Sequence, residues 1–121
     1  MDRSPDVVVV GAGQAGLAVA YGLRRTGRSF VLLDDQPGPG GAWRHAWDSL
    51  RLFSPARFSS LPGVLMAGGP DDYPTRDETV AYLAAYEARY ALPVERPVRV
   101  HAVERADGDP AGRLVVRTDR G

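Results

Sequence analysis

The sequence of 121 residues contains no cysteine and no lysine, and its two histidines stand far apart. Without cysteine the chain can form no disulfide, no thiolate metal site and no dithiol redox relay. His45 and His101 have no carboxylate at metal-ligand spacing beside them, so we expect no metal site. The first apolar run, after MDRSPD, is four valines long, too short for a signal peptide or a membrane span.

The sequence also lacks an excess of charge of either sign. Fifteen arginines balance fifteen acidic residues, so the chain has no net field to attract nucleic acid or an anionic membrane. The length corresponds to one domain with its own core. We therefore expect a soluble, cytoplasmic protein that binds neither nucleic acid nor membrane.

The first 34 residues predict a β-α-β unit. Residues 7–10, VVVV, are typical of a strand buried on both faces of a parallel sheet. Residues 14–26 are rich in Ala and Leu and stop before Gly27, which predicts a helix. Residues 29–34, SFVLLD, predict a second buried strand, reached by a right-handed crossover.

Residues 35–74 combine many Pro and Gly with large apolar side chains. This composition indicates a long loop packed against the rest of the domain, and such loops are usually functional. A capping box of Thr75 and Glu78 then begins a second helix, which should stop near Leu92. We expect this helix to bury a stripe formed by Val80, Leu83, Tyr86 and Tyr90.

The last third of the sequence predicts strands. Residues 93–95 are a third short parallel strand, and residues 97–105 and 113–118 alternate apolar and polar side chains across the turn DGDPAG. The predicted fold is α/β: a Rossmann-like parallel sheet, made of the βαβ unit with a second helix, plus an antiparallel β-hairpin from an incomplete meander.

The pattern Gly11-x-Gly13-x-x-Gly16 leaves the first strand and opens the first helix, as in dinucleotide-binding proteins. Gly11 makes the tight turn, Gly13 lets a pyrophosphate approach, and Gly16 brings helix and strand together. The phosphates would lie on the helix amino terminus. A glycine turn that only packs helix on sheet is the structural alternative.

An acid ends the second predicted strand. Asp34 would accept hydrogen bonds from the ribose hydroxyls, with Asp35 as a less favoured substitute. These features suit NAD and the adenosine half of FAD equally, and do not separate the two.

Three further stretches carry a resemblance to a known family. They are the Gly40-Gly41-Ala42-Trp43 motif, WDSLRLFSP at 47–55 and YPTRDETVAYLAAYEARYALPV at 73–94. In combination with the glycine loop, they resemble the class B flavin-dependent monooxygenases, which include flavin-containing and Baeyer–Villiger monooxygenases. The resemblance implies that this loop binds FAD and that a second loop, later in such proteins, binds NADPH.

The resemblance also implies roles for individual residues. The glycine loop would line the FAD pyrophosphate, Asp34 would hold the adenosine ribose, and Gly40, Gly41 and Trp43 would lie along the flavin side. Trp43 is equally consistent with an ordinary core tryptophan, and Val100, whose counterpart contacts the adenine, with a core valine. Arg44 could meet a phosphate or the nicotinamide cofactor, or be a solvated arginine. The implied FAD site comprises Gly11, Gly13, Gln14, Ala15, Gly16, Asp34, Asp35, Gly40, Gly41, Trp43, Arg44 and Val100.

One departure concerns the chemistry. Related monooxygenases carry an Asn-Thr-Pro-like triplet near the reactive flavin, where this chain has Phe53-Ser54-Pro55. Phe53 cannot donate the hydrogen bond of that Asn, which weakens the case for oxygenation, and no catalytic residue is identified.

The family's FAD domain is longer than this chain. We therefore expect residues 1–121 to be the N-terminal part of an FAD-binding domain, inactive alone, with the NADPH domain absent. The alternatives are a nucleotide-binding module without catalysis and an NAD-dependent dehydrogenase domain. Unpaired strand edges predict a homodimer.

Overall fold

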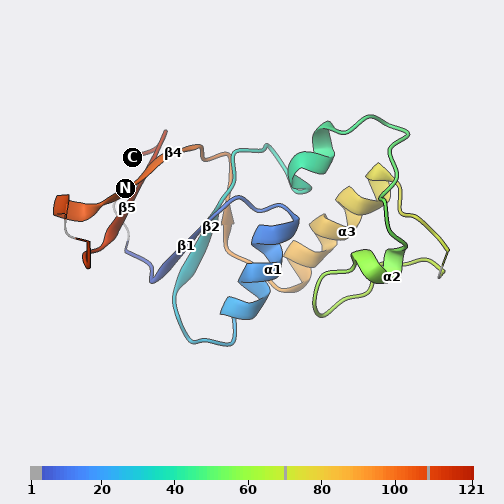
Figure 1. The fold of residues 1–121 in the computed structure, drawn as a ribbon, viewed down its shortest axis with the longest axis horizontal. Coiled ribbons are helices and arrows are strands. Elements are labelled where there is room, and N and C mark those ends of the chain that lie inside the picture. Colours follow the sequence, from blue (N-terminus) through green and yellow to red (C-terminus); the bar gives the residue numbers. More distant parts are fainter. Residues whose placement is uncertain (1–3, 70, 109) are drawn as a thin grey trace.

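The computed structural model describes residues 4–69, 71–108 and 110–121. Three parallel strands form one sheet in the order β1-β2-β3: β1 (Val7–Val10), β2 (Phe30–Leu33) and β3 (Val94–Glu95). Helix α1 (Gln14–Leu23) packs on β1 and β2, and α3 (Arg76–Arg89) lies beside α1 (Figure 1). The β-α-β unit, the second helix and the third parallel strand are confirmed.

The predicted antiparallel hairpin is also confirmed, as a sheet of its own. Strands β4 (Val100–Arg105) and β5 (Leu114–Thr118) pair antiparallel, with the short 3₁₀ helix η2 (Ala106–Gly108) after β4. The hairpin lies at the opposite end of the molecule from α2 (Ala56–Ser59) (Figure 1). A small apolar cluster joins the hairpin to β2; its members are Val8, Val31, Leu33, Val98, Val100 and Val116.

Two sequence predictions are wrong in detail. Helix α1 ends at Leu23 rather than near Thr26, because the Thr26 hydroxyl and amide both donate to the Leu23 carbonyl and close a turn there. Strand β1 is half-buried rather than buried on both faces, and Val10 is 56% exposed. The cause is the strand order, which leaves β1 at one edge of the sheet.

The main core lies between α1, α3 and the sheet. Its largest fully buried side chains are Leu17, Leu32, Leu83 and Tyr86. Helix α3 buries the predicted stripe at Leu83 and Tyr86, while Thr79 is more deeply buried than Val80.

Tyrosine hydroxyls on α3 fix the long segment 35–74. Tyr86 donates to the Pro62 carbonyl, and Tyr82 donates to the Val64 carbonyl while accepting from the Leu61 amide. The segment contains η1 (Gly41–His45), a 3₁₀ helix, and the short helix α2. It packs against the domain as expected, although its side chains Trp47, Phe53 and Phe58 are exposed. None of the helices in the described residues is both long and apolar enough to cross a membrane.

The capping box of α3 yields a first prediction. The Glu78 amide donates to the Thr75 hydroxyl at 3.1 Å, and the Glu78 carboxylate accepts from the Thr75 amide at 3.0 Å. Thr75→Ala should lower the free energy of unfolding by about 1 kcal/mol in urea denaturation, because an amide at the helix end loses its acceptor. Thr75→Ser keeps the hydroxyl and should lower the free energy of unfolding by no more than about 0.3 kcal/mol. Equal losses in both variants would contradict the role of the hydroxyl.

A second prediction follows from the burial of Tyr86. Desolvation raises the pKa of this phenol to about 12. Its neutral form is favoured in the folded chain, so its contribution to stability is complete below about pH 10 and is lost as pH rises toward 12. The free energy of unfolding should therefore fall in that interval, and tyrosinate absorbance should report a late-ionising tyrosine. In Tyr86→Phe the free energy of unfolding should fall less steeply over this pH interval. An unchanged pH dependence would contradict the assignment of the late ionisation to Tyr86.

Candidate functional site

A hollow of about 390 Å³ lies at the amino end of α1, between the loop after β1 and the 3₁₀ helix η1. Five residues of the predicted glycine loop line it, together with Trp43 from η1. Two lining residues were not predicted, Val10 and Ala42. The full lining is Val10, Gly11, Gly13, Gln14, Ala15, Gly16, Ala42 and Trp43.

The fold requires two of the three loop glycines, for two different reasons. Gly11 has φ +97°, a left-handed conformation that favours glycine. A Cβ on Gly16 would lie 2.1 Å from the Gly11 carbonyl oxygen, so only glycine lets α1 approach the loop this closely. Both findings agree with the structural part of the sequence prediction.

Gly13 is different, because the chain itself does not require glycine there. Its φ is −84°, and an added Cβ would meet only the Gly41 Cα, at 3.6 Å, an ordinary contact. Gly13 lines the hollow, so the space left by its missing side chain is available to a ligand.

The amino end of α1 also opens on this hollow. Among the described residues no side chain caps it. The first amides of a helix have no partner within the helix, and the helix dipole favours an anion beside them. Bare main chain and free amides together fit a pyrophosphate.

The Gly40-Gly41 pair explains how η1 reaches the glycine loop. A Cβ on Gly41 would lie 2.8 Å from the Gly13 Cα, so the two main chains are in direct contact. Gly41 also has φ +53°, and Gly40 has φ +117°. Neither residue lines the hollow. Within this chain, the missing side chain of Gly41 makes room for Gly13, whereas the resemblance implies that it makes room for the flavin.

Trp43 has a core contact as one alternative expected, while its contact with a flavin stays a prediction. It lines the hollow and also packs against the main core. Val10 and Ala42 were missed, although each directly adjoins a glycine of a predicted motif. Their position next to Gly11 and Gly41 is the sequence signal that could have found them.

Asp34 lies at the carboxyl end of β2, next to the glycine loop but outside the lining of the hollow. The Gly11 amide donates to the carbonyl of Leu33, the residue before Asp34, at 2.7 Å. Asp34 is 3% exposed, and its Oδ2 accepts a hydrogen bond from Nε of Arg96 at 2.9 Å. Sequence reasoning missed Arg96. Asp35 is exposed, and its carboxylate accepts a hydrogen bond from the side-chain amide of Gln36.

Arg44 and Val100 are placed in structural contacts. The Arg44 guanidinium donates to the Pro39 carbonyl at 2.9 Å, and the Arg44 carbonyl accepts from Arg76 at 3.2 Å, so this residue ties its loop to the start of α3. Val100 is half-buried in the apolar cluster of the hairpin. Their predicted contacts with a cofactor stay predictions.

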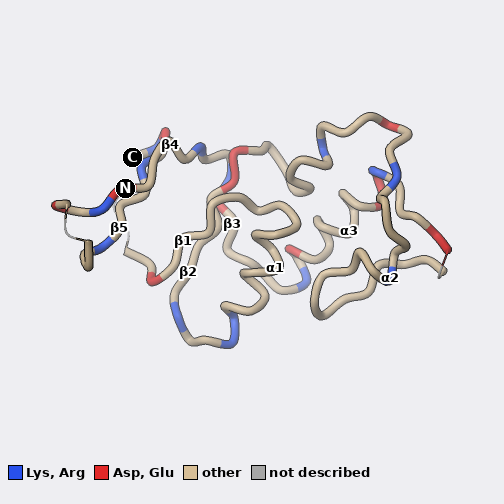
Figure 2. The backbone as a smooth tube through the Cα atoms, in the orientation of Figure 1, with Lys and Arg blue, Asp and Glu red and all other residues tan. Residues whose placement is uncertain are grey.

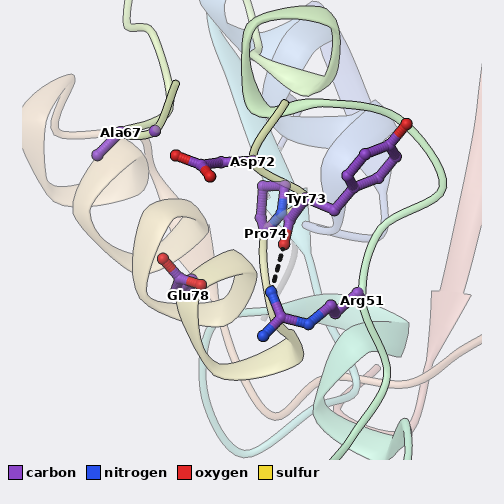
Figure 3. A pocket seen from close by; sticks show the side chains of 7 residues that line it. Arg51, Ala67, Asp72, Tyr73, Pro74 and Glu78 are labelled. Atoms are coloured by element: carbon purple, nitrogen blue, oxygen red, sulfur yellow. Dashed lines mark hydrogen bonds between the residues drawn. The ribbon is translucent and has the colours of Figure 1, made fainter. Parts of the chain in front are cut away.

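A second hollow, of about 250 Å³, lies between the 47–74 segment and α3. Arg51, Asp72 and Glu78 face it (Figure 3), and each is already bound to nearby main chain. Arg51 donates to the Tyr73 carbonyl, Asp72 accepts from the Gly69 amide, and Glu78 accepts from the Thr75 amide. The first two bonds lie within the segment and the third belongs to the capping box of α3, so the chain itself already engages the charged side chains around this hollow.

The charged residues are spread over the whole length of the backbone, with acidic and basic positions interspersed (Figure 2). In the part of the chain that the structure describes, no group of three or more His, Asp or Glu could hold a metal ion. His45 contacts the Gln36 side chain at 2.5 Å.

Comparison with known proteins agrees with this geometry. The sequence matches the pyridine nucleotide-disulphide oxidoreductase family over residues 8–121. An uncharacterized oxidoreductase, CzcO-like, from Geobacillus kaustophilus is 40% identical over 107 residues, covering 88% of this chain and 31% of that protein. Indole-3-pyruvate monooxygenase YUCCA8 from Oryza sativa subsp. indica is 38% identical over 86 residues, covering 70% and 20%.

Solved structures show the same fold. A flavin-containing monooxygenase from Stenotrophomonas maltophilia is 54% identical, with a TM-score of 0.88 over 100% of this chain and 35% of that one. A steroid monooxygenase bound to NADP is 29% identical, with a TM-score of 0.85 over 98% of this chain and 24% of that one. The chain thus spans at most 35% of the length of these relatives.

The contact between Gly41 and Gly13 can be tested directly. Gly41→Ala should lower the free energy of unfolding by about 1–3 kcal/mol in urea denaturation, because the added methyl group separates the two main chains. Gly27→Ala is the matched control, since Gly27 also has a positive φ, +74°, and no atom lies within 4 Å of its added Cβ. The control should lose only about 1 kcal/mol, the cost of the left-handed conformation, and Gly41→Ala should lose clearly more. Similar effects in the two variants would rule out close packing at Gly41.

Proposed function

This chain belongs to the pyridine nucleotide-disulphide oxidoreductase family, and we propose that it is the FAD-binding part of an NAD(P)H-dependent flavoprotein monooxygenase. The hollow at the amino end of α1 carries the proposal. Gly13 is bare although neither its own conformation nor its neighbours require glycine, and a pyrophosphate does require close approach to main chain. Similarity to monooxygenases that include a flavin-containing one supports FAD over NAD at this site.

Each end of the site has its own task. The amides at the start of α1 bind and orient the pyrophosphate over Gly13, and the Trp43 side chain covers part of the hollow and excludes water. Asp34 accepts hydrogen bonds from the ribose hydroxyls. FAD, when bound, supplies the electron transfer and oxygen activation.

Use of NADPH is part of the same proposal. A similar steroid monooxygenase is solved with NADP bound, and the single glycine fingerprint of this chain is assigned to FAD. We assign no catalytic residue among the 121, and we expect these residues alone to be inactive. The outer edge of β1 has no strand partner within the described residues, and self-association through such edges stays a prediction.

The test is an FAD titration of the apoprotein, made from the protein as its gene encodes it. The wild type should bind FAD saturably, with quenching of flavin fluorescence. Gly13→Ala should weaken binding at least about tenfold, because the methyl group separates the pyrophosphate from charge-assisted hydrogen bonds. Its free energy of unfolding should fall by no more than about 1 kcal/mol, the cost of Ala at a helix N-cap.

Gly22→Ala is the control, since Gly22 lies within α1 and no atom lies within 4 Å of its added Cβ, and it should bind FAD like the wild type. If Gly13→Ala binds FAD as tightly as the wild type, the hollow is not the cofactor site. A wild-type protein that responds to NAD but not to FAD would instead support a dehydrogenase domain. NADPH oxidation by the FAD-loaded protein tests the oxidoreductase activity separately.

A further inference from the structure

Three charged side chains meet at the carboxyl ends of β2 and β3. Arg96 donates from Nε to Oδ2 of Asp34 at 2.9 Å, and from Nη1 and Nη2 to the two carboxylate oxygens of Glu87 at 2.6 and 2.9 Å. The side chains of Asp34, Arg96 and Glu87 are 4%, 13% and 16% exposed. We call these three residues the charge junction.

The sheet register brings the first pair together. Leu32 and Leu33 of β2 pair with Val94 and Glu95 of β3, so the next residues on the two strands are Asp34 and Arg96. The Asp34 amide donates to the Glu95 carbonyl, and the Val98 amide donates to the Asp34 carbonyl. The main chain on both sides of the Asp34 carboxylate is therefore fixed.

Stability alone is a poor explanation for the charge junction. Removing charges from water is costly, and apolar side chains often replace a buried ion pair with no loss of stability. The junction also holds one cation and two carboxylates, so its net charge is negative. Such an arrangement beside a proposed ribose site points to recognition.

Each of the three guanidinium nitrogens of Arg96 already donates a hydrogen bond to a carboxylate. An arginine near the ribose acid commonly accommodates the 2′-phosphate of NADP. Here, however, Nη1 and Nη2 bind Glu87 and Nε binds Asp34. The bond with Glu87 raises the pKa of Arg96, so the cation is permanent, and its charge is already more than balanced by its two partners.

One oxygen of the Asp34 carboxylate is not bound within the described part of the chain. Oδ2 binds Arg96, and Oδ1 has no hydrogen bond among the described residues. A carboxylate oxygen accepts hydrogen bonds and cannot donate one, so it suits a hydroxyl and repels a phosphate.

We propose that Arg96, held by Glu87, is a positioning residue that turns the Asp34 carboxylate toward the adenosine ribose, and that the net negative charge of the junction excludes a 2′-phosphate. The inference rests on the proposed function, since it takes the FAD site as given. It adds two residues, Arg96 and Glu87, that select a dinucleotide with a free ribose diol.

The experiment measures competition with FAD, so that binding elsewhere on the protein does not register. FAD rebinding to the apoprotein, made as the gene encodes it, is followed by flavin fluorescence in the presence of ADP, 2′-deoxy-ADP, ADP-ribose or 2′-phospho-ADP-ribose. In the wild type, ADP should compete about tenfold better than 2′-deoxy-ADP, the value of one hydrogen bond to a charged group. ADP-ribose should likewise outcompete its 2′-phosphorylated form.

Arg96→Met should reduce the preference for ADP over 2′-deoxy-ADP to below about threefold, while 2′-deoxy-ADP itself competes as before. Arg96→Lys keeps the charge but not the three-bond geometry, and should give an intermediate preference. Glu87→Gln removes one negative charge and should relax the rejection of 2′-phospho-ADP-ribose at least about threefold. Arg99→Met, an exposed arginine three residues away, is the matched control and should change neither ratio.

Each contrary result has a distinct meaning. If the Arg96 variants weaken competition by ADP and by 2′-deoxy-ADP to the same extent, or change neither, Arg96 has only a structural role and the inference is overturned. Wild-type protein that binds FAD but does not discriminate between ADP and 2′-deoxy-ADP also overturns it, while leaving the proposed function intact. Wild-type protein that does not bind FAD overturns the proposed function, and the inference with it.

Discussion

Direct contact between two stretches of bare main chain sets the geometry of the site. Gly41 lies so close to Gly13 that a side chain on Gly41 would have to displace one of the two segments. Because η1 begins at Gly41, the same contact places Ala42 and Trp43 over the amino end of α1. Two glycine motifs that are far apart in sequence are thus parts of one structure, in which the second supplies a wall for the first.

The charge junction couples the other end of the site to the core. Asp34 directly follows β2, Arg96 directly follows β3, and Glu87 belongs to α3, so three elements meet at one guanidinium. Removing one partner from such a buried group leaves an uncompensated charge, which costs far more than the pair gains. The position of the acid at the end of β2 therefore depends on a residue 62 positions later in the chain.

The sequence predicted the local elements well, since local chemistry determines them. The valine run, the capping box of Thr75 and Glu78, and the alternation in the hairpin each identify an element from neighbouring residues. Contacts between distant segments were not predictable in this way, because Gly41 on Gly13 and Arg96 on Asp34 depend on strand register and loop path. The aromatic content of residues 35–74 suggested burial, yet Phe53 is 90% exposed. Tyrosine hydroxyls of α3, bound to backbone carbonyls, hold that segment instead.

Helix α3 connects the two ends of the proposed site. At its start, Arg76 donates hydrogen bonds to the Arg44 carbonyl in η1 and to the Asp48 carboxylate. Near its end, the Glu87 carboxylate accepts hydrogen bonds from Arg96. The helix has 14 residues, so at ~1.5 Å per residue it is about 21 Å long. A helix of this length keeps η1 and the charge junction at a fixed separation, as a ligand that spans both requires. Fraying at Thr75 would release η1 first and leave Glu87 in place, because helix ends open locally before the core does. The wall over Gly13 is therefore the part of the site that depends most on the capping box, and the acid at the end of β2 the part that depends on it least.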